Sequence, residues 1–257
     1  MNLKISLINQ LLRCSYAKKL RNLFGIRPSL DLIDYTSKNI SVSDAFFWRT
    51  DGEFETIFKF TNILDYFYDV NESKIKLIFF DNNNNLLKEH NILKSDSSSK
   101  ILINKSFLNH ISNYGVFYVF HETNDSLSAI IRNSCYTGYS WKKNIPSMVH
   151  GNTITAQKKF TNHKIDYGIG GYSFFKKRSY IVQNFFSSKK TEVLLVNPTN
   201  TTIEVNVNKN IFKLKKGCSK LIDIVDNTNL IKINSKCYLL RPIVFENNND
   251  YLNVYHG

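Results

Sequence analysis

Glycine, proline and long apolar runs are scarce in this chain. It has 10 glycines and 4 prolines in 257 residues, and its hydrophobic content of 42% is enough to bury a core, which argues against a disordered chain. No apolar run approaches the roughly 20 residues that a membrane-spanning helix needs. No secretory signal with a small-residue cleavage site is recognisable either. We therefore expect a cytoplasmic protein without a transmembrane helix.

The common signatures of metal and cofactor chemistry are also missing. The four cysteines, Cys14, Cys135, Cys218 and Cys237, include no C-x-x-C pair, so we expect no zinc site and free, buried thiols. There is no P-loop, no G-x-S-x-G, no H-E-x-x-H and no dinucleotide glycine fingerprint. These absences exclude the commonest enzyme types and predict no cofactor. They leave open whether the chain is an enzyme of another kind.

Acidic residues are outnumbered. The chain has 34 Lys and Arg against 21 Asp and Glu, a formal charge of +13. Such an excess favours polyanionic partners. Lysine and asparagine are also abundant in proteins from AT-rich genomes, which weakens that argument. The basic residues spread along the chain without a recognised RNA or DNA motif, so nucleic-acid binding is the weakest of the functional alternatives.

The first thirty residues contain no acidic side chain and predict a basic amphipathic helix. Leu3, Leu7 and Leu11 recur at a spacing of four, and Gly25 and Pro28 end the pattern. Three interpretations compete. The helix packs on its own protein with the basic face in water, or residues 1–28 lie on an anionic membrane surface, or the segment is an organellar targeting sequence. The first is slightly favoured, and membrane contact is second.

After residue 30 the pattern becomes that of short β-strands separated by turns. Strands are predicted over 54–60, 74–80, 86–93, 100–103 and 114–121, and again over 180–184, 192–196, 203–207, 211–214, 220–224 and 238–245. The two series can be laid over one another in the same order, which predicts an internal duplication. The expected fold is mainly β, with two related antiparallel β-sandwich modules.

The predicted domains follow from this alignment. They are the helix over 1–30, a first module with its lead-in over 31–121, a connector or lobe over 122–177, and a second module over 178–257. The stretch "TEVLLVNPTNTTIEVNV", residues 191–207, resembles a widespread Ig-like module and is similar to the small sandwich of the sensory-rhodopsin-transducer family. The resemblance implies a sandwich that binds a small ligand or a partner, often as a homo-oligomer. It transfers no active-site residue.

Candidate binding residues gather in two segments outside the aligned strands. Residues 41–56 hold an acid, a tryptophan and an arginine, and residues 122–177 hold polar aromatics with His, Asn and Arg. Stacking surface and planar hydrogen-bonding groups are what a glycan or another polar ligand needs. The candidates, including the strand-end histidine before the second segment, are Asp44, Trp48, Arg49, His121, Arg132, Tyr136, Tyr139, Trp141, His150 and Asn152.

Each candidate also has a structural explanation. Trp48 packs on a sheet edge as readily as it stacks on a sugar, and His150 beside Gly151 is typical of a turn histidine. The leading hypothesis is a non-catalytic binding or assembly protein, with a polar-ligand site, carbohydrate included, where the two modules meet. The alternative is an enzyme acting on a sugar or a sugar derivative, as in surface-polysaccharide biosynthesis, with His150, His121, Arg49 and Asp44 as its polar groups.

Overall fold

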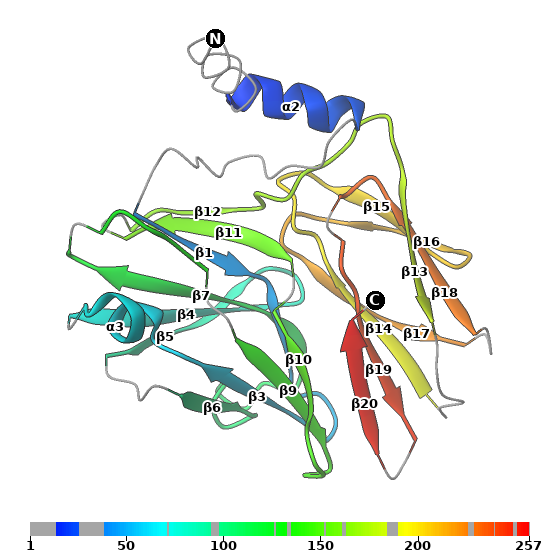
Figure 1. Ribbon diagram of the computed structural model, residues 1–257. Helices are drawn as coiled ribbons and strands as arrows, with labels where there is room; N and C mark the ends of the chain where they lie inside the picture. The colour runs from blue at the N-terminus through cyan, green and yellow to red at the C-terminus, as the bar shows by residue number, and fades with distance from the viewer. Residues whose placement is uncertain are drawn as a thin grey trace.

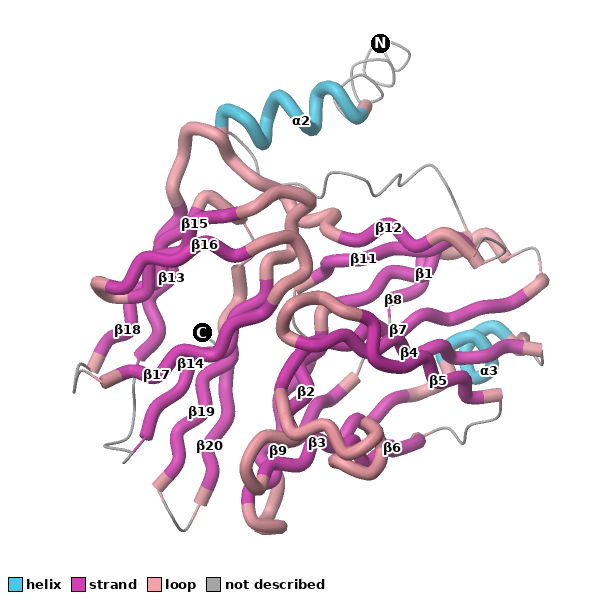
Figure 2. Tube along the Cα trace, turned by 180° about the vertical axis from the view of Figure 1, so that it is seen from behind, coloured by secondary structure: helices cyan, strands magenta, loops and turns pink. Residues whose placement is uncertain are grey.

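The computed structural model is mainly β, and the residues that it describes form five four-stranded sheets and two helices (Figures 1 and 2). It describes residues 14–25, 39–70, 72–93, 98–125, 127–132, 135–151, 153–160, 163–183, 190–225, 229–238, 240–248 and 251–256. Asn152 and residues 1–13 lie outside these ranges. No helix in the described ranges is long and apolar enough to cross a membrane.

Each sheet is named after one of its strands. The β1 sheet has the order β12 (Ile165–Tyr167), β11 (Ile154–Lys159), β1 (Ile40–Asp44), β8 (Ile130–Arg132). The β7 sheet has the order β2 (Phe46–Arg49), β7 (Tyr114–Thr123), β4 (Ser73–Asp81), β5 (Leu86–Ile92). The β3 sheet has the order β10 (Ser147–His150), β9 (Tyr136–Trp141), β3 (Phe54–Phe60), β6 (Ser99–Ile103).

The other two sheets come from the C-terminal part of the chain. The β15 sheet has the order β13 (Arg178–Gln183), β18 (Leu230–Ser235), β15 (Ile203–Val207), β16 (Asn210–Leu214). The β14 sheet has the order β17 (Ser219–Ile224), β14 (Lys190–Val196), β19 (Ile243–Asn247), β20 (Leu252–His256). The helices are α2 (Ser15–Phe24) and α3 (Ile63–Tyr68).

This arrangement corrects the predicted fold. Five sheets of four strands correspond to a five-bladed β-propeller arrangement, and not to two tandem Ig-like β-sandwich modules. The predicted resemblance to Ig-like modules and to the sandwich of the sensory-rhodopsin-transducer family is therefore also wrong. Residues 122–177, predicted as a connector or lobe, supply β8 to β12, and β9 pairs with β3 along six residue pairs. Sequence patterns predicted strands but could not predict their partners.

Strand order within the sheets is interleaved and does not follow the chain. The β1 sheet contains a parallel pair, β1 with β8, and joins segments about a hundred positions apart. The order β2-β7-β4-β5 has the same succession along the chain as β13-β18-β15-β16, and β10-β9-β3-β6 the same as β20-β19-β14-β17. In this shared order β7 corresponds to β18, whereas the sequence alignment had paired 114–121 with 238–245, the segment that contains β19. The β1 sheet has no counterpart.

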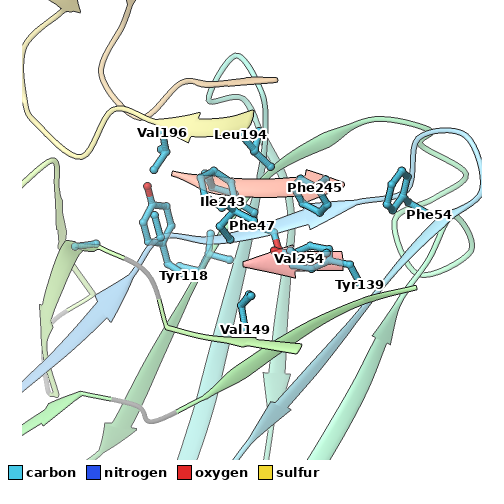
Figure 3. Close-up of a cluster of buried hydrophobic side chains, with 14 of the residues drawn as sticks. Phe47, Phe54, Tyr118, Tyr139, Val149, Leu194, Val196, Ile243, Phe245 and Val254 are labelled. Atoms are coloured by element: carbon cyan, nitrogen blue, oxygen red, sulfur yellow. The ribbon is translucent and has the colours of Figure 1, made fainter. Parts of the chain in front are cut away.

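The main core draws side chains from four of the five sheets (Figure 3). Phe47 and Tyr118 come from the β7 sheet, Tyr139 from the β3 sheet, and Phe245 from the β14 sheet, while Ala156 adds the β1 sheet. Phe245 meets Tyr139 and Phe54 edge-to-face, at ring-centroid distances of 4.9 and 5.9 Å. This shared core holds the N-terminal and C-terminal parts of the chain against each other.

Strand β14 is nearly continuously apolar because alternate side chains point into two different buried cores. Leu194 and Val196 point into the shared core, whereas Val193 and Leu195 point into a second core between the β14 and β15 sheets. A third core lies between the β7 and β3 sheets and contains Trp48, Phe58 and Phe117. A strand buried on both faces loses the polar-apolar alternation of an exposed one.

Candidate functional site

A kinked segment places the first residue of the candidate site. Ala45 alone separates β1 from β2, and every other residue from Ile40 to Arg49 lies in one of these two strands. The register of β1 against β11 shifts between Ser43 and Asp44, as at a β-bulge. Bulges bend a strand and redirect its side chains. The shift leaves Asp44 buried at the end of β1.

Arg132, at the end of the neighbouring strand β8, binds the carboxylate of Asp44 through two hydrogen bonds. Its Nε donates to Oδ1 and its Nη2 to Oδ2, both at 2.8 Å. The Arg132 side chain is 49% exposed, while that of Asp44 is 1% exposed. Burial raises the pKa of Asp44, and the hydrogen bonds from Arg132 act in the opposite direction. The pair therefore presents a fixed guanidinium to solvent.

A second arginine, from the C-terminal part of the chain, acts on the same carboxylate electrostatically. Arg241 donates from Nη1 to the carbonyl of Gly151 at 3.3 Å and interacts electrostatically with Asp44. The pKa of Arg241 is lowered, first by burial and also by repulsion from Arg132. Arg132 thus binds the carboxylate of Asp44 directly, and Arg241 acts on it electrostatically.

Two histidines adjoin these arginines. His150, at the end of β10, acts electrostatically on Asp44. The ring of His256, at the end of β20, lies 5.5 Å from that of His150, and its Nε2 is 2.7 Å from the His150 carbonyl. Burial lowers the pKa of His256, and its hydrogen bonds to backbone carbonyls oppose the shift. Tyr136 is the antiparallel partner of His150 and is 53% exposed.

The cluster therefore combines four predicted residues with two that the sequence did not reveal. Asp44, Arg132, Tyr136 and His150 come together, and Arg241 and His256 join them. Arg241 precedes a strand and His256 ends the last one, so neither shows a motif or a spacing that links it to the others. Arg241 and His256 reach the cluster because β19 pairs with β20 and β20 packs on β10.

The remaining predicted residues lie elsewhere. Trp48 and Tyr139 are fully buried and donate to the carbonyls of Phe80 and Phe47 at 2.9 and 3.1 Å, so their placement does not support sugar stacking. Arg49 binds the chain's own carboxylates, Asp51 and Glu192. Three predicted residues remain. His121 is buried, and Asn152 is outside the described residues. Trp141 ends β9, and the Nζ of Lys142 lies 4.1 Å from the centre of its ring.

Two hollows lie apart from the cluster. The first, of about 340 Å³, surrounds Glu122, whose carboxylate binds Lys74 at 2.9 Å and Lys158 at 2.6 Å. The second, of about 440 Å³, is lined by Lys142 and Lys143 from the hairpin after β9 and by Lys105. Two lysines and two glutamates line the first hollow and balance in charge. No grouping of acidic, cysteine and histidine side chains within the described ranges is suited to hold a metal ion.

Neither a protein family model nor a curated protein matches this chain. The chemistry of the cluster is therefore the basis for a functional conclusion.

Proposed function

We propose that this protein is a non-catalytic binding protein whose site takes the anionic group of a polar ligand, with an acidic sugar as the ligand class. The observation that carries the proposal is that Arg132 binds both oxygens of the Asp44 carboxylate, while Arg241 and His150 act on the same carboxylate electrostatically. Guanidinium groups bind carboxylates and phosphates through paired hydrogen bonds. The two arginines supply the attraction for the anionic group of the ligand.

The exposed ring of Tyr136 supports a sugar as the remainder of the ligand. Tyr136 pairs directly with His150 on the neighbouring strand, so an exposed aromatic side chain stands beside the imidazole. Aromatic faces pack against the C–H groups of sugar rings while the polar edge hydrogen-bonds. The site also joins residues 44–150 to residues 241–256, as expected for a ligand held where two parts of a chain meet.

Binding fits the cluster better than the alternative, an enzyme acting on a sugar. The carboxylate of Asp44 is held by Arg132 on both oxygens, and the ring of His256 is engaged by the carbonyls of His150 and Pro242. Burial raises the pKa of the Cys135 thiol well above its ordinary value, which disfavours the nucleophilic thiolate. Groups fixed in this way orient a ligand more readily than they transfer protons.

The test compares sugars that differ in charge alone. Titration calorimetry with glucuronate and with glucose should show binding of glucuronate only. Arg241→Gln should weaken that binding about tenfold or more, since a charged hydrogen bond contributes roughly 1.5–3 kcal/mol. Lys213→Gln, which removes one exposed positive charge from β16, is the matched control and should leave the affinity unchanged. Equal affinity for both sugars, or an unchanged Arg241→Gln variant, would contradict the proposal.

We also propose a cytoplasmic location, in peripheral contact with a membrane. All four cysteines are free thiols, the state that a reducing compartment maintains. Fractionation of cells that express the tagged chain tests this location, and recovery of the protein from a secreted fraction would refute it.

A further inference from the structure

Helix α2 exposes its apolar side chains and buries polar ones. Tyr16, Leu20 and Phe24 recur at a spacing of four and form one stripe, with exposed fractions of 80%, 55% and 55%. On another side of the helix, Lys18 and Asn22 are buried at 7% and 2%. A helix that simply packs on its own protein shows the reverse arrangement. The exposed stripe therefore needs a different explanation.

Two phenylalanines from the C-terminal part of the chain extend this stripe. Phe174 and Phe175 are 57% and 63% exposed, and the ring of Phe175 stacks on that of Phe24 at a centroid distance of 5.7 Å. We call Tyr16, Leu20, Leu23, Phe24, Phe174 and Phe175 the apolar patch. Large exposed apolar patches on a monomer mark sites of interaction with a partner or a membrane.

The patch has a defined position because the C-terminal end of α2 is fastened to the protein. The Tyr238 hydroxyl donates to the carbonyl of Asn22 at 2.8 Å, and the backbone N–H of Phe175 donates to the carbonyl of Leu23 at 3.4 Å. Gly25 ends the helix with a φ of 66°, which favours glycine. Helix α2 lies at one edge of the molecule, beyond the sheets (Figure 1). The patch is thus held outward at the end of the structure.

The charges on the two segments that form the patch are all of one sign, while Glu204 of β15 lies 3.8 Å from Lys177. Residues 14–25 and 172–183 contain no Asp or Glu. Basic side chains surround the patch, and Lys236 lies over the ring of Phe174 at 5.2 Å. The exposed or partly exposed members are Lys19, Arg21, Lys176, Lys177, Arg178 and Lys236. A ring of basic residues around exposed aromatic and leucine side chains is complementary to an anionic lipid surface.

We propose that the apolar patch docks this protein on an anionic membrane surface. The six apolar side chains enter the boundary between headgroups and acyl chains, and the surrounding lysines and arginines pair with lipid phosphates. Helix α3 offers an internal comparison. It also exposes aromatic side chains, Tyr66 and Phe67, but Asp65 and Asp69 lie beside them. That surface lacks the charge complementarity, so we expect no membrane contact there.

The experiment is flotation of the full chain with vesicles of phosphatidylcholine, with and without phosphatidylglycerol. The wild-type chain should float only with the anionic vesicles. Leu20→Glu combined with Phe175→Glu should reduce the partition coefficient at least tenfold. Tyr66→Glu combined with Phe67→Glu adds the same negative charge on α3 and should leave the partition coefficient unchanged. Lys176→Gln with Lys177→Gln should lower it about fivefold for each charge removed.

Several outcomes would overturn the docking proposal. They are equal flotation with neutral vesicles, equal loss in both double-glutamate variants, or no flotation of the wild-type chain. A concentration-dependent dimer that dissociates in the Leu20→Glu, Phe175→Glu variant, without vesicle binding, would assign the patch to a second copy of the chain. Glucuronate binding should persist in that variant, so failure of the docking proposal is distinguishable from failure of the proposed sugar site. Thermal unfolding of each variant verifies that it is folded.

Discussion

Arg49 on β2 and Glu192 on β14 form a buried ion pair, although they are 143 positions apart in the chain. The Nη1–Oε2 distance is 2.8 Å, and the two side chains are 2% and 5% exposed. The guanidinium also lies over the ring of Phe54 at 3.9 Å and that of Phe245 at 4.6 Å. Arg49, a candidate for binding the anionic group of a ligand, therefore binds a carboxylate of the protein itself.

Removing one partner of this pair should be costly. Arg49→Met leaves the buried Glu192 with Lys190, 2.7 Å away and 55% exposed, as its remaining cationic partner in the described residues, and breaking a buried pair costs about 3–5 kcal/mol of unfolding free energy. Urea unfolding measures the loss. Lys142→Met is the control, because Lys142 and Glu53 are exposed and 3.9 Å apart, and such pairs contribute about 1 kcal/mol or less. Equal losses in the two variants would argue against a buried pair.

Stability should fall in mild acid because of His121. The pKa of this histidine is lowered from 6.5 to about 4 by burial, and neither ring nitrogen has a hydrogen-bond partner among the described residues. Between these two values the unfolded chain binds the proton and the folded chain does not, so stability decreases as the pH falls. The expected loss between pH 7 and pH 5 is about 2 kcal/mol.

His121→Leu should remove most of this pH dependence, as measured by urea unfolding at both pH values. The residual slope would come from other groups, including His90 and His256, whose pKa values are also lowered by burial. His163→Leu alters an exposed histidine and should retain the wild-type slope. If the His121→Leu variant loses stability with acid as steeply as the wild type does, the histidine is not the cause.

Trp48→Phe should destabilise the protein without affecting sugar binding. The indole N–H donates to the carbonyl of Phe80 at 2.9 Å, and the ring is fully buried. Loss of the hydrogen bond and the cavity left behind cost about 2–4 kcal/mol. Trp141→Phe, at a partly exposed position, should cost much less. Thermal unfolding and glucuronate titration of both variants separate a packing role from a binding role.

Gly151→Ala should disturb the candidate site through Asp44. A Cβ atom at position 151 would lie 2.5 Å from the Asp44 Oδ2, so the carboxylate would have to move away from Arg132. We expect a loss of about 1–3 kcal/mol in unfolding free energy, together with weaker glucuronate binding. In an Asp44→Ala background the same substitution should cost little, because its steric partner is gone. Additive losses in this double-mutant cycle would show that the contact is unimportant.

Strand positions could be read from the sequence to a large extent. The predicted strand over 54–60 coincides with β3, and the one over 203–207 coincides with β15. In both, alternating buried and less buried residues give the period of two that identifies a strand. The end of the N-terminal helix at Gly25 is also confirmed. Residues 1–13 of that predicted helix lie outside the described residues.

Other elements gave no usable pattern. Every residue of β1 and β2 is buried, including Ser41, Ser43 and Asp44, so no alternation marks these strands. The hydroxyl groups of Ser41 and Ser43 accept hydrogen bonds from the backbone of β7, which only the folded sheet arrangement explains. Helix α3 has six residues and was missed because one and a half turns carry little periodicity.

Residue types in the sequence indicated candidate site residues, but they did not indicate which of these residues lie together in the folded chain. Polar aromatics with Arg, His and Asp drew attention to Asp44, Arg132, Tyr136 and His150, which lie in the cluster. The same reasoning selected Trp48 and Tyr139, which the core absorbs. Residue type alone does not distinguish a side chain that faces a ligand from one that fills the interior. Arg241 and His256 required the partners of β19 and β20, which no local pattern encodes.

The core shared by four sheets has a consequence for how the chain can be divided. Leu194, Ile243 and Phe245 are packed against side chains from strands that precede residue 160. A fragment that ended near residue 177 would leave this apolar face in water, and its C-terminal remainder would expose the matching face. Neither piece should be recoverable as a stable product of truncation or limited proteolysis, and the whole chain should melt in a single cooperative transition.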